Sequence, residues 1–256
     1  MLPFLDELKP YGQYWFVTIT PYGKDIEPNV PDKETVMEGF KELSDVVGAD
    51  SMGWRYDPIF IDKKYSVEWH MSEVEKMAEI LAGYTKTCVI SFIDIYKKVE
   101  RNFPEAKAVR AEDRATIGKA FVKIASEYGM VVKPCAEGDH LAKYGADCSG
   151  CMTVHTFETA LHNRLEVPKR KKNQRNGECA CLLGTDIGAY DTCGHLCKYC
   201  YANVNPVLVK ENMRKHNPDS PFLLGGYMQG DIVREAVQKS WIDRQIRLDF
   251  ELEHLI

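Results

Sequence analysis

Residues 88–96 read CVISFIDIY, one of four runs in the first half of the chain that predict buried β-strands. Each run is apolar, β-branched or aromatic along nearly its whole length, as expected of a strand covered on both faces. The other three runs are Tyr14–Thr20 (YWFVTIT), Met52–Ile61 and Met130–Glu137. Because such strands are typical of parallel sheets, the four runs predict one parallel sheet.

Three amphipathic stretches with helical spacing separate these runs, over residues 31–48, 66–83 and 112–128. A Pro near the first start, Ser66 at the second start and a Gly after each end are usual helix boundary residues. His70, on the second stretch, is expected at the surface. Strands that alternate with crossover helices predict an α/β fold, either a TIM-like βα barrel or an open doubly wound sheet.

Composition places the chain among globular proteins. It has 256 residues, of which 45% are hydrophobic and 28% charged, which excludes disordered and collagen-like classes. The first ten residues, MLPFLDELKP, carry three charges and lack a signal-peptide core, and no apolar run approaches the ~20 residues of a membrane span. We therefore expect a cytoplasmic protein with no membrane partner.

The nine cysteines are distributed unevenly along the chain. Cys88 and Cys135 stand alone, whereas the other seven fall between Cys148 and Cys200. In a protein that is not secreted, such a cluster is more often a metal site than a set of disulfides. The sequence thus predicts a βα partial barrel over residues 1–137 and a cysteine-rich module over residues 138–256.

Residues 193–200 read CGHLCKYC, with three cysteines on one short segment. Cys193, Cys197 and Cys200 can bind three corners of a [4Fe–4S] cluster and leave the fourth iron open to a substrate or cofactor. The alternative is a structural zinc site in which His195 is the fourth ligand. The spacing favours the cluster, because tetrahedral zinc sites more often pair two CxxC segments.

This CxxxCx-aromatic-C segment resembles the cluster motif of the radical S-adenosylmethionine (radical SAM) enzymes. The resemblance implies that the three cysteines bind iron, that Tyr199 lies against the adenine of SAM, and that cleavage of SAM yields a 5′-deoxyadenosyl radical. It also implies a reductant such as ferredoxin or flavodoxin. The usual GGE motif for the SAM amino group has its nearest match in Gly225 and Gly226, where Tyr227 replaces the acid.

Four further segments read TPYGKDIEPN, WRYDPI, SFIDIYKK and KKNQRNGECACLLGTDIGAYDTCGHLCKYCYAN. Together they resemble a bacterial family, the domain of unknown function 1848 family. Members of that family carry strands upstream of the segment with which this chain starts, so the resemblance implies an N-terminally truncated barrel. In ordinary radical SAM enzymes the cluster loop follows the first barrel strand, which suggests that this order is a circular permutation.

Four further cysteines lie in the same region: Cys148, Cys151, Cys179 and Cys181. Their number suits a closed zinc site or a second, fully ligated iron–sulfur cluster. The alternative is that some are ordinary buried thiols, because free cysteine is among the most buried residue types.

Polar residues gather where the predicted strands end, and they are Arg55, Asp57, Asp94 and Glu137. In parallel βα folds, ligands bind at the carboxyl ends of the strands, so these residues are candidates for catalysis or substrate binding. The alternative is that they form structural ion pairs and loop caps.

The sequence therefore predicts a [4Fe–4S] enzyme of radical SAM type. The alternatives are an iron–sulfur electron-transfer or sensor protein without SAM chemistry, and a zinc-stabilised binding module. The basic run at residues 169–175, KRKKNQR, could contact phosphates. The net charge of −5 nevertheless favours a small-molecule substrate over nucleic acid.

Overall fold

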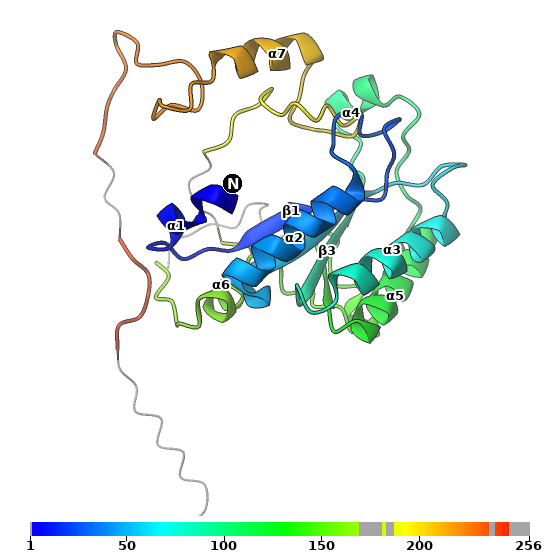
Figure 1. The fold of residues 1–256 in the computed structure, drawn as a ribbon. Coiled ribbons are helices and arrows are strands. Elements are labelled where there is room, and N and C mark those ends of the chain that lie inside the picture. Colours follow the sequence, from blue (N-terminus) through cyan, green and yellow to red (C-terminus); the bar gives the residue numbers. More distant parts are fainter. Residues whose placement is uncertain (1, 169–180, 183–186, 236–238, 246–256) are drawn as a thin grey trace, which may run out of the picture.

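The computed structural model describes residues 2–168, 181–182, 187–235 and 239–245. Within them a four-stranded parallel sheet in the order β1-β2-β3-β4 forms the centre, and helices pack along it (Figure 1). The basic run at residues 169–175 lies outside the described residues. In chain order the elements are η1 (Leu2–Phe4), α1 (Leu5–Leu8), β1 (Trp15–Thr18), α2 (Lys33–Val47), η2 (Ala49–Ser51), β2 (Met52–Ile59), α3 (Val67–Leu81), β3 (Thr87–Phe92), α4 (Lys97–Asn102), α5 (Ala111–Glu127), β4 (Val131–Pro134), η3 (Ala142–Tyr144), α6 (Val154–Leu161) and α7 (Pro206–Lys215).

The strands and helices confirm the α/β prediction. Every predicted strand forms, but β3 ends at Phe92 and β4 at Pro134, so the polar residues that follow leave the sheet. The strands follow one another in sequential order, with a helix in each crossover. The described residues hold four strands with β1 and β4 at the edges, which is a partial α/β fold.

The helix boundaries follow from residue chemistry. In α3 the hydroxyl of Ser66 accepts a hydrogen bond from the backbone amide of Trp69 at 3.2 Å, and this cap satisfies a donor that would otherwise lack a partner. Helix α2 ends at Gly48, whose φ of 87° is a conformation that glycine adopts without strain. None of the described helices is long and apolar enough to cross a membrane.

The main core lies between the sheet and helices α2, α3 and α5. Trp54 and Tyr56 of β2 are fully buried on this face, and the ring centroid of Tyr56 lies 5.1 Å from that of Phe121 in α5. The indole N–H of the buried Trp54 needs a hydrogen-bond partner. It donates to the carbonyl of Ile19 at 2.9 Å. The helix-covered face is therefore apolar with its few polar atoms paired.

The prediction that His70 lies at the surface is wrong. Its side chain is 0% exposed, and its two ring nitrogens lie 2.8 Å from the hydroxyl of Tyr56 and 2.8 Å from the carbonyl of Phe60. Burial lowers the pKa of His70 to about 4, so the ring is neutral at pH 7. The two hydrogen bonds explain how a polar ring can occupy this core.

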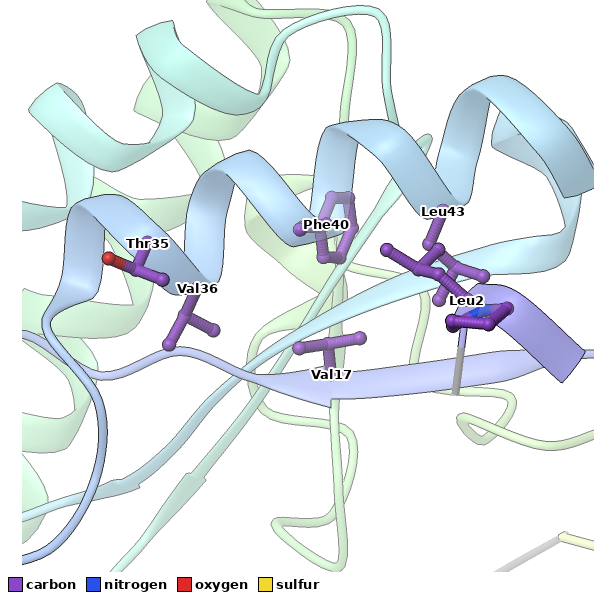
Figure 2. A pocket seen from close by; sticks show the side chains of 8 residues that line it. Leu2, Val17, Thr35, Val36, Phe40 and Leu43 are labelled. Carbon is purple, nitrogen blue, oxygen red and sulfur yellow. The ribbon is translucent and has the colours of Figure 1, made fainter.

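An apolar pocket of about 400 Å³ lies between α2, the edge strand β1 and the N-terminal segment (Figure 2). Val17, Val36, Phe40 and Leu43 line it together with Leu2, and Thr35 is the polar side chain among those labelled. Since no titratable side chain lines this pocket, it offers no group for acid–base or metal chemistry. The candidate functional site lies elsewhere.

Candidate functional site

The cysteines of CGHLCKYC lie on a loop, residues 191–204, that is closed by its own hydrogen bonds. We call it the triad loop. The amide of Asp191 donates to the carbonyl of Ala202 at 3.2 Å, and the Asp191 carboxylate accepts a bond from the amide of Val204. The side chain of Asn203 donates to the carbonyl of Cys193 at 2.9 Å. Both ends of the cysteine segment are therefore fastened to each other.

The three thiols differ in exposure. Cys193 is exposed, whereas Cys197 and Cys200 are half-buried, and the amide of Cys200 donates to the carbonyl of Cys197 at 3.1 Å. Burial, the carboxylate of Glu27 and the neighbouring thiols raise the pKa of Cys197 to about 11. Free thiolates are thus disfavoured here, and a bound metal would compensate for their charge.

The triad loop is bonded to the segment that follows β1. The amide of Lys198 donates to the carbonyl of Ile26 at 3.0 Å, and Asn29 donates from its backbone to His195 at 3.2 Å and from its side chain to Gly194 at 2.8 Å. Since this segment leaves the carboxyl end of β1, the triad loop lies beyond that end of the sheet, where α/β proteins bind ligands.

A second attachment comes from α4, which follows β3. Arg101 donates to the carbonyl of Val204 at 2.6 Å, and Asn102 donates to that of Asn203 at 3.5 Å. Figure 1 shows the segment before α7 passing beside α4. The two attachments hold the cysteine segment over the ends of β1 and β3.

A buried carboxylate, Glu27, connects the triad loop to the sheet. Glu27 is 2% exposed and accepts hydrogen bonds from the hydroxyl of Thr20 at 2.5 Å, from the ammonium of Lys33 and from the hydroxyl of Tyr199. Burial and the charge of Glu27 raise the pKa of Tyr199, which stays protonated. The ring of Tyr199 also packs 6.0 Å from that of Tyr22.

Sequence reasoning missed Glu27 and Lys33. The available signal was an acid in TPYGKDIEPN, directly after the first strand, where an ionised side chain has to find a partner once it is buried.

The contacts of the predicted rim residues pair Arg55 with Asp57, and Glu137 with Arg114. The guanidinium of Arg55 pairs with the carboxylate of Asp57, with Nε 3.1 Å from Oδ1, and lies 5.1 Å from the ring centroid of Phe16. This pair belongs to β2, on the face of the sheet opposite helices α2, α3 and α5. Its geometry supports the ion-pair alternative.

Glu137 and Asp94 are the other two predicted rim residues. Glu137 accepts a bond from the amide of Phe92 at 2.8 Å and pairs with Arg114 at 3.0 Å, while burial raises the pKa of Glu137. Asp94 is exposed and accepts a bond from the hydroxyl of Tyr96 at 2.9 Å.

Gly225 and Gly226 are not brought to the triad loop by any contact of the described residues. Both are exposed, and a Cβ atom added at either would meet no atom within 4 Å. Their expected role in binding SAM stays a prediction.

A second group of thiols was not expected in this combination. The Sγ atom of Cys151 lies 3.4 Å from that of Cys181 and 3.8 Å from that of Cys135. Cys148 lies apart, against the main core, with the backbone of Leu141 and Ala142 facing its sulfur. Cys179 lies outside the described residues. A metal site made of Cys148, Cys151, Cys179 and Cys181 therefore stays a prediction.

The cluster of Cys135, Cys151 and Cys181, which we call the thiol cluster, has a cation beside it. The thiol of Cys151 donates to Cys135, and this bond together with the charge of Arg55 lowers the pKa of Cys135 to about 7. The hydrogen bonds of Cys151 with Cys135 and Cys181, together with burial, raise the pKa of Cys151. Across the part of the chain that the structure describes, no group of three or more His, Cys, Asp or Glu side chains is arranged to hold a single metal ion.

Comparison with known proteins gives one result. A family model described as Domain of unknown function (DUF1848) matches residues 1–202, a range that includes the sheet and ends directly after the cysteine triad. No curated protein and no solved structure matches the chain.

Proposed function

The chain belongs to the DUF1848 family, and from this premise we propose that it is a [4Fe–4S] protein of radical SAM type acting on a small molecule. Cys193, Cys197 and Cys200 would bind the cluster. The observation that carries the proposal is the triad loop, which presents three cysteines of suitable spacing on one closed segment beyond the ends of β1 and β3.

The described residues fit a cluster better than a single ion. A cluster takes one thiolate on each of three irons, so its ligands need not converge on one point as the ligands of zinc do. Three thiols on a loop fastened at both ends meet this requirement without a fourth protein ligand. The side chain of His195 is exposed, and its backbone carbonyl accepts the bond from Asn29.

Within this proposal the protein's own residues orient and insulate the site. When bound, the cluster and SAM supply reductive cleavage of the sulfonium and thereby a radical. Glu27, held by Lys33 and Tyr199, fixes the loop to the sheet and places a negative charge beside Cys197. Cys193 is exposed, which leaves an approach for an electron donor such as ferredoxin or flavodoxin.

One observation favours the alternative of an electron-transfer or sensor protein without SAM. The hydroxyl of Tyr199 is already bonded to Glu27 and its ring packs near Tyr22, so part of the surface expected to meet adenine is occupied by the protein itself. The proposal then requires that the remaining face of Tyr199 be sufficient for the cofactor.

Anaerobic reconstitution distinguishes these functions. We expect about four irons with sulfide per chain, and loss of this iron in Cys197→Ala. Cys88→Ala is the matched control, because Cys88 is buried in β3 and belongs to neither predicted metal site, and it should retain the iron. Adding SAM to the reduced cluster should change its electron paramagnetic resonance spectrum and yield 5′-deoxyadenosine.

Two outcomes would contradict the proposal at different levels. An intact, reduced cluster that SAM leaves unchanged supports the electron-transfer alternative. If natively expressed protein contains stoichiometric zinc and no sulfide, the chain binds no iron–sulfur cluster. That result supports the zinc-stabilised binding module.

A further inference from the structure

The thiol cluster joins three segments that are distant in sequence. Cys135 follows β4, and its amide donates to the carbonyl of Ile90 in β3 at 2.8 Å. The segments that carry Cys151 and Cys181 are bonded to each other. The amide of Leu182 donates to the carbonyl of Met152 at 2.8 Å, and the amide of Met152 donates to the sulfur of Cys181 at 3.3 Å. Backbone hydrogen bonds therefore set the positions of all three sulfurs.

The cluster has an inner pair and an outer member. Cys151 and Cys181 are each 2% exposed and pack with Val89, whereas Cys135 is half-buried. The inner sulfurs are 3.4 Å apart, so a disulfide of about 2.05 Å requires them to approach by about 1.4 Å. Neither Cys151 nor Cys181 belongs to a helix or strand, so this approach disturbs no regular element.

An ion pair, Arg55 with Asp57, lies beside the thiol cluster. The guanidinium of Arg55 interacts electrostatically with Cys135 and with Cys151. The guanidinium stabilises a thiolate at Cys135, and the carboxylate of Asp57 opposes this effect in part.

We propose that Cys135, Cys151 and Cys181 form a redox-active thiol relay that is oxidised by a low-molecular-weight disulfide and stores the oxidation as a buried Cys151–Cys181 disulfide. This inference does not depend on the cluster proposed for the triad loop, because the two sites share no side chain. It assigns a role to Cys135, which stands alone in the sequence.

The electrons and atoms balance in three exchanges. The Cys135 thiolate attacks one sulfur of the small disulfide, so a mixed disulfide forms and one small thiol leaves with the proton that Cys135 released. Cys151 then attacks the Cys135 sulfur and displaces the second small thiol, which takes the Cys151 proton. Finally Cys181 attacks Cys151 and returns Cys135 to the thiol form. Two protein thiols are oxidised and one small disulfide is reduced.

The relay order follows from exposure. Cys135 is the least buried of the three, so a small disulfide should react there first, and it lies 3.8 Å from Cys151, which in turn contacts Cys181. The final disulfide is 2% exposed on both sides and is therefore protected from direct reduction by thiols in solution. Reduction has to return through Cys135.

The test exposes the reduced full chain to oxidised glutathione under anaerobic conditions. Free thiols are trapped at intervals, and the peptides are identified by fragmentation mass spectrometry. We expect a Cys151–Cys181 disulfide to accumulate. Cys135→Ser should slow its formation at least about tenfold, because the accessible thiol is removed. Cys148→Ser is the matched control and should leave the rate unchanged.

Two further variants report on the order of steps without removing the first thiol. Cys151→Ser should retain glutathione on Cys135 as a stable mixed disulfide, and Cys181→Ser should stop at a Cys135–Cys151 disulfide. Arg55→Gln keeps all three thiols and should slow the first exchange. This variant tests the relay even if a cysteine variant fails to fold.

Two results would overturn the relay. The first is a Cys151–Cys181 disulfide that forms at the same rate in Cys135→Ser as in the unaltered chain. The second is one zinc ion per chain, detected by native mass spectrometry, that protects the three thiols from trapping and is lost in Cys135→Ser; the thiol cluster would then be a metal site.

Discussion

Replacing Glu27 by Gln tests how the triad loop is attached to the sheet. The substitution keeps the size of the side chain but removes a charge that is 2% exposed and bonded to Thr20, Lys33 and Tyr199. A hydrogen bond to a charged group contributes about 1.5–3 kcal/mol, and the Lys33 ammonium is left without a counter-ion. We expect the free energy of unfolding to fall by about 2–3 kcal/mol, or about 5–10 °C in Tm for a chain of this size.

The interaction free energy between Glu27 and Tyr199, measured with a double-mutant cycle, distinguishes loss of the loop attachment from a general loss of stability. Tyr199→Phe removes only the hydroxyl, so its cost in Glu27→Gln should be smaller than in the unaltered chain by about 1 kcal/mol. Guanidinium unfolding of the unaltered chain, both single variants and the double variant measures this difference. Hydrogen exchange at the amide of Lys198, which is bonded to Ile26, should accelerate in both single variants.

A tyrosine on the same loop provides the control. Tyr201 is 62% exposed, so Tyr201→Phe should change neither the unfolding free energy nor the exchange of Lys198. If the effects of Glu27→Gln and Tyr199→Phe add to within about 0.3 kcal/mol, the two side chains are not in contact and the loop is not attached through Glu27.

Three other predictions concern the core and the loop. Burial lowers the pKa of His70 from 6.5 to about 4, so the unfolded chain binds a proton at this residue more readily than the folded chain does. The free energy of unfolding should therefore fall by about 3 kcal/mol as the pH falls from 6.5 to 4. His70→Gln should remove this part of the pH dependence of unfolding. Gly53→Ala places a Cβ atom 2.6 Å from the Phe16 ring and should lower the free energy of unfolding by about 1–3 kcal/mol, whereas Gly39→Ala, in the open middle of α2, should raise it by about 0.5–1 kcal/mol, both measured by denaturant unfolding. Asn203→Ala removes the bond to the carbonyl of Cys193, so the reconstituted chain should lose iron to a chelator faster than the unaltered chain does.

The elements could be predicted from sequence because their signals are local. Each element depends mainly on residues that are close in sequence, as in the apolar runs at 14–20 and 88–96 and the cap at Ser66. The structure confirms the two strands and the helix there. The prediction for His70 was wrong because polar residues outside the apolar stripe of an amphipathic helix are expected to face solvent. The bonds that satisfy His70 come from Tyr56 and Phe60, which lie outside its helix.

The sites were predicted less completely, because they depend on which segments meet. The spacing of the cysteine triad is visible in one line of sequence, but the role of Glu27 requires the loop at 191–204 to return to the segment after β1. Cys135 is separated from Cys151 by η3 and from Cys181 by α6 as well. Grouping cysteines by nearness in sequence therefore placed Cys148 with Cys151, whereas the fold places Cys135 there.

An ion pair lies beside each cysteine site, Glu27 with Lys33 at one and Arg55 with Asp57 at the other, and the pKa of the neighbouring thiol shifts in opposite directions at the two sites. At the triad loop the carboxylate of Glu27 opposes a free thiolate at Cys197, so thiolates there are stabilised when a metal supplies positive charge. At the thiol cluster the hydrogen bond from Cys151 and the guanidinium of Arg55 lower the pKa of Cys135, and Asp57 opposes them in part. A free thiolate therefore forms more readily at Cys135 than at Cys197. Because the sites share no side chain, iron content and disulfide mapping can refute one proposal while the other stands.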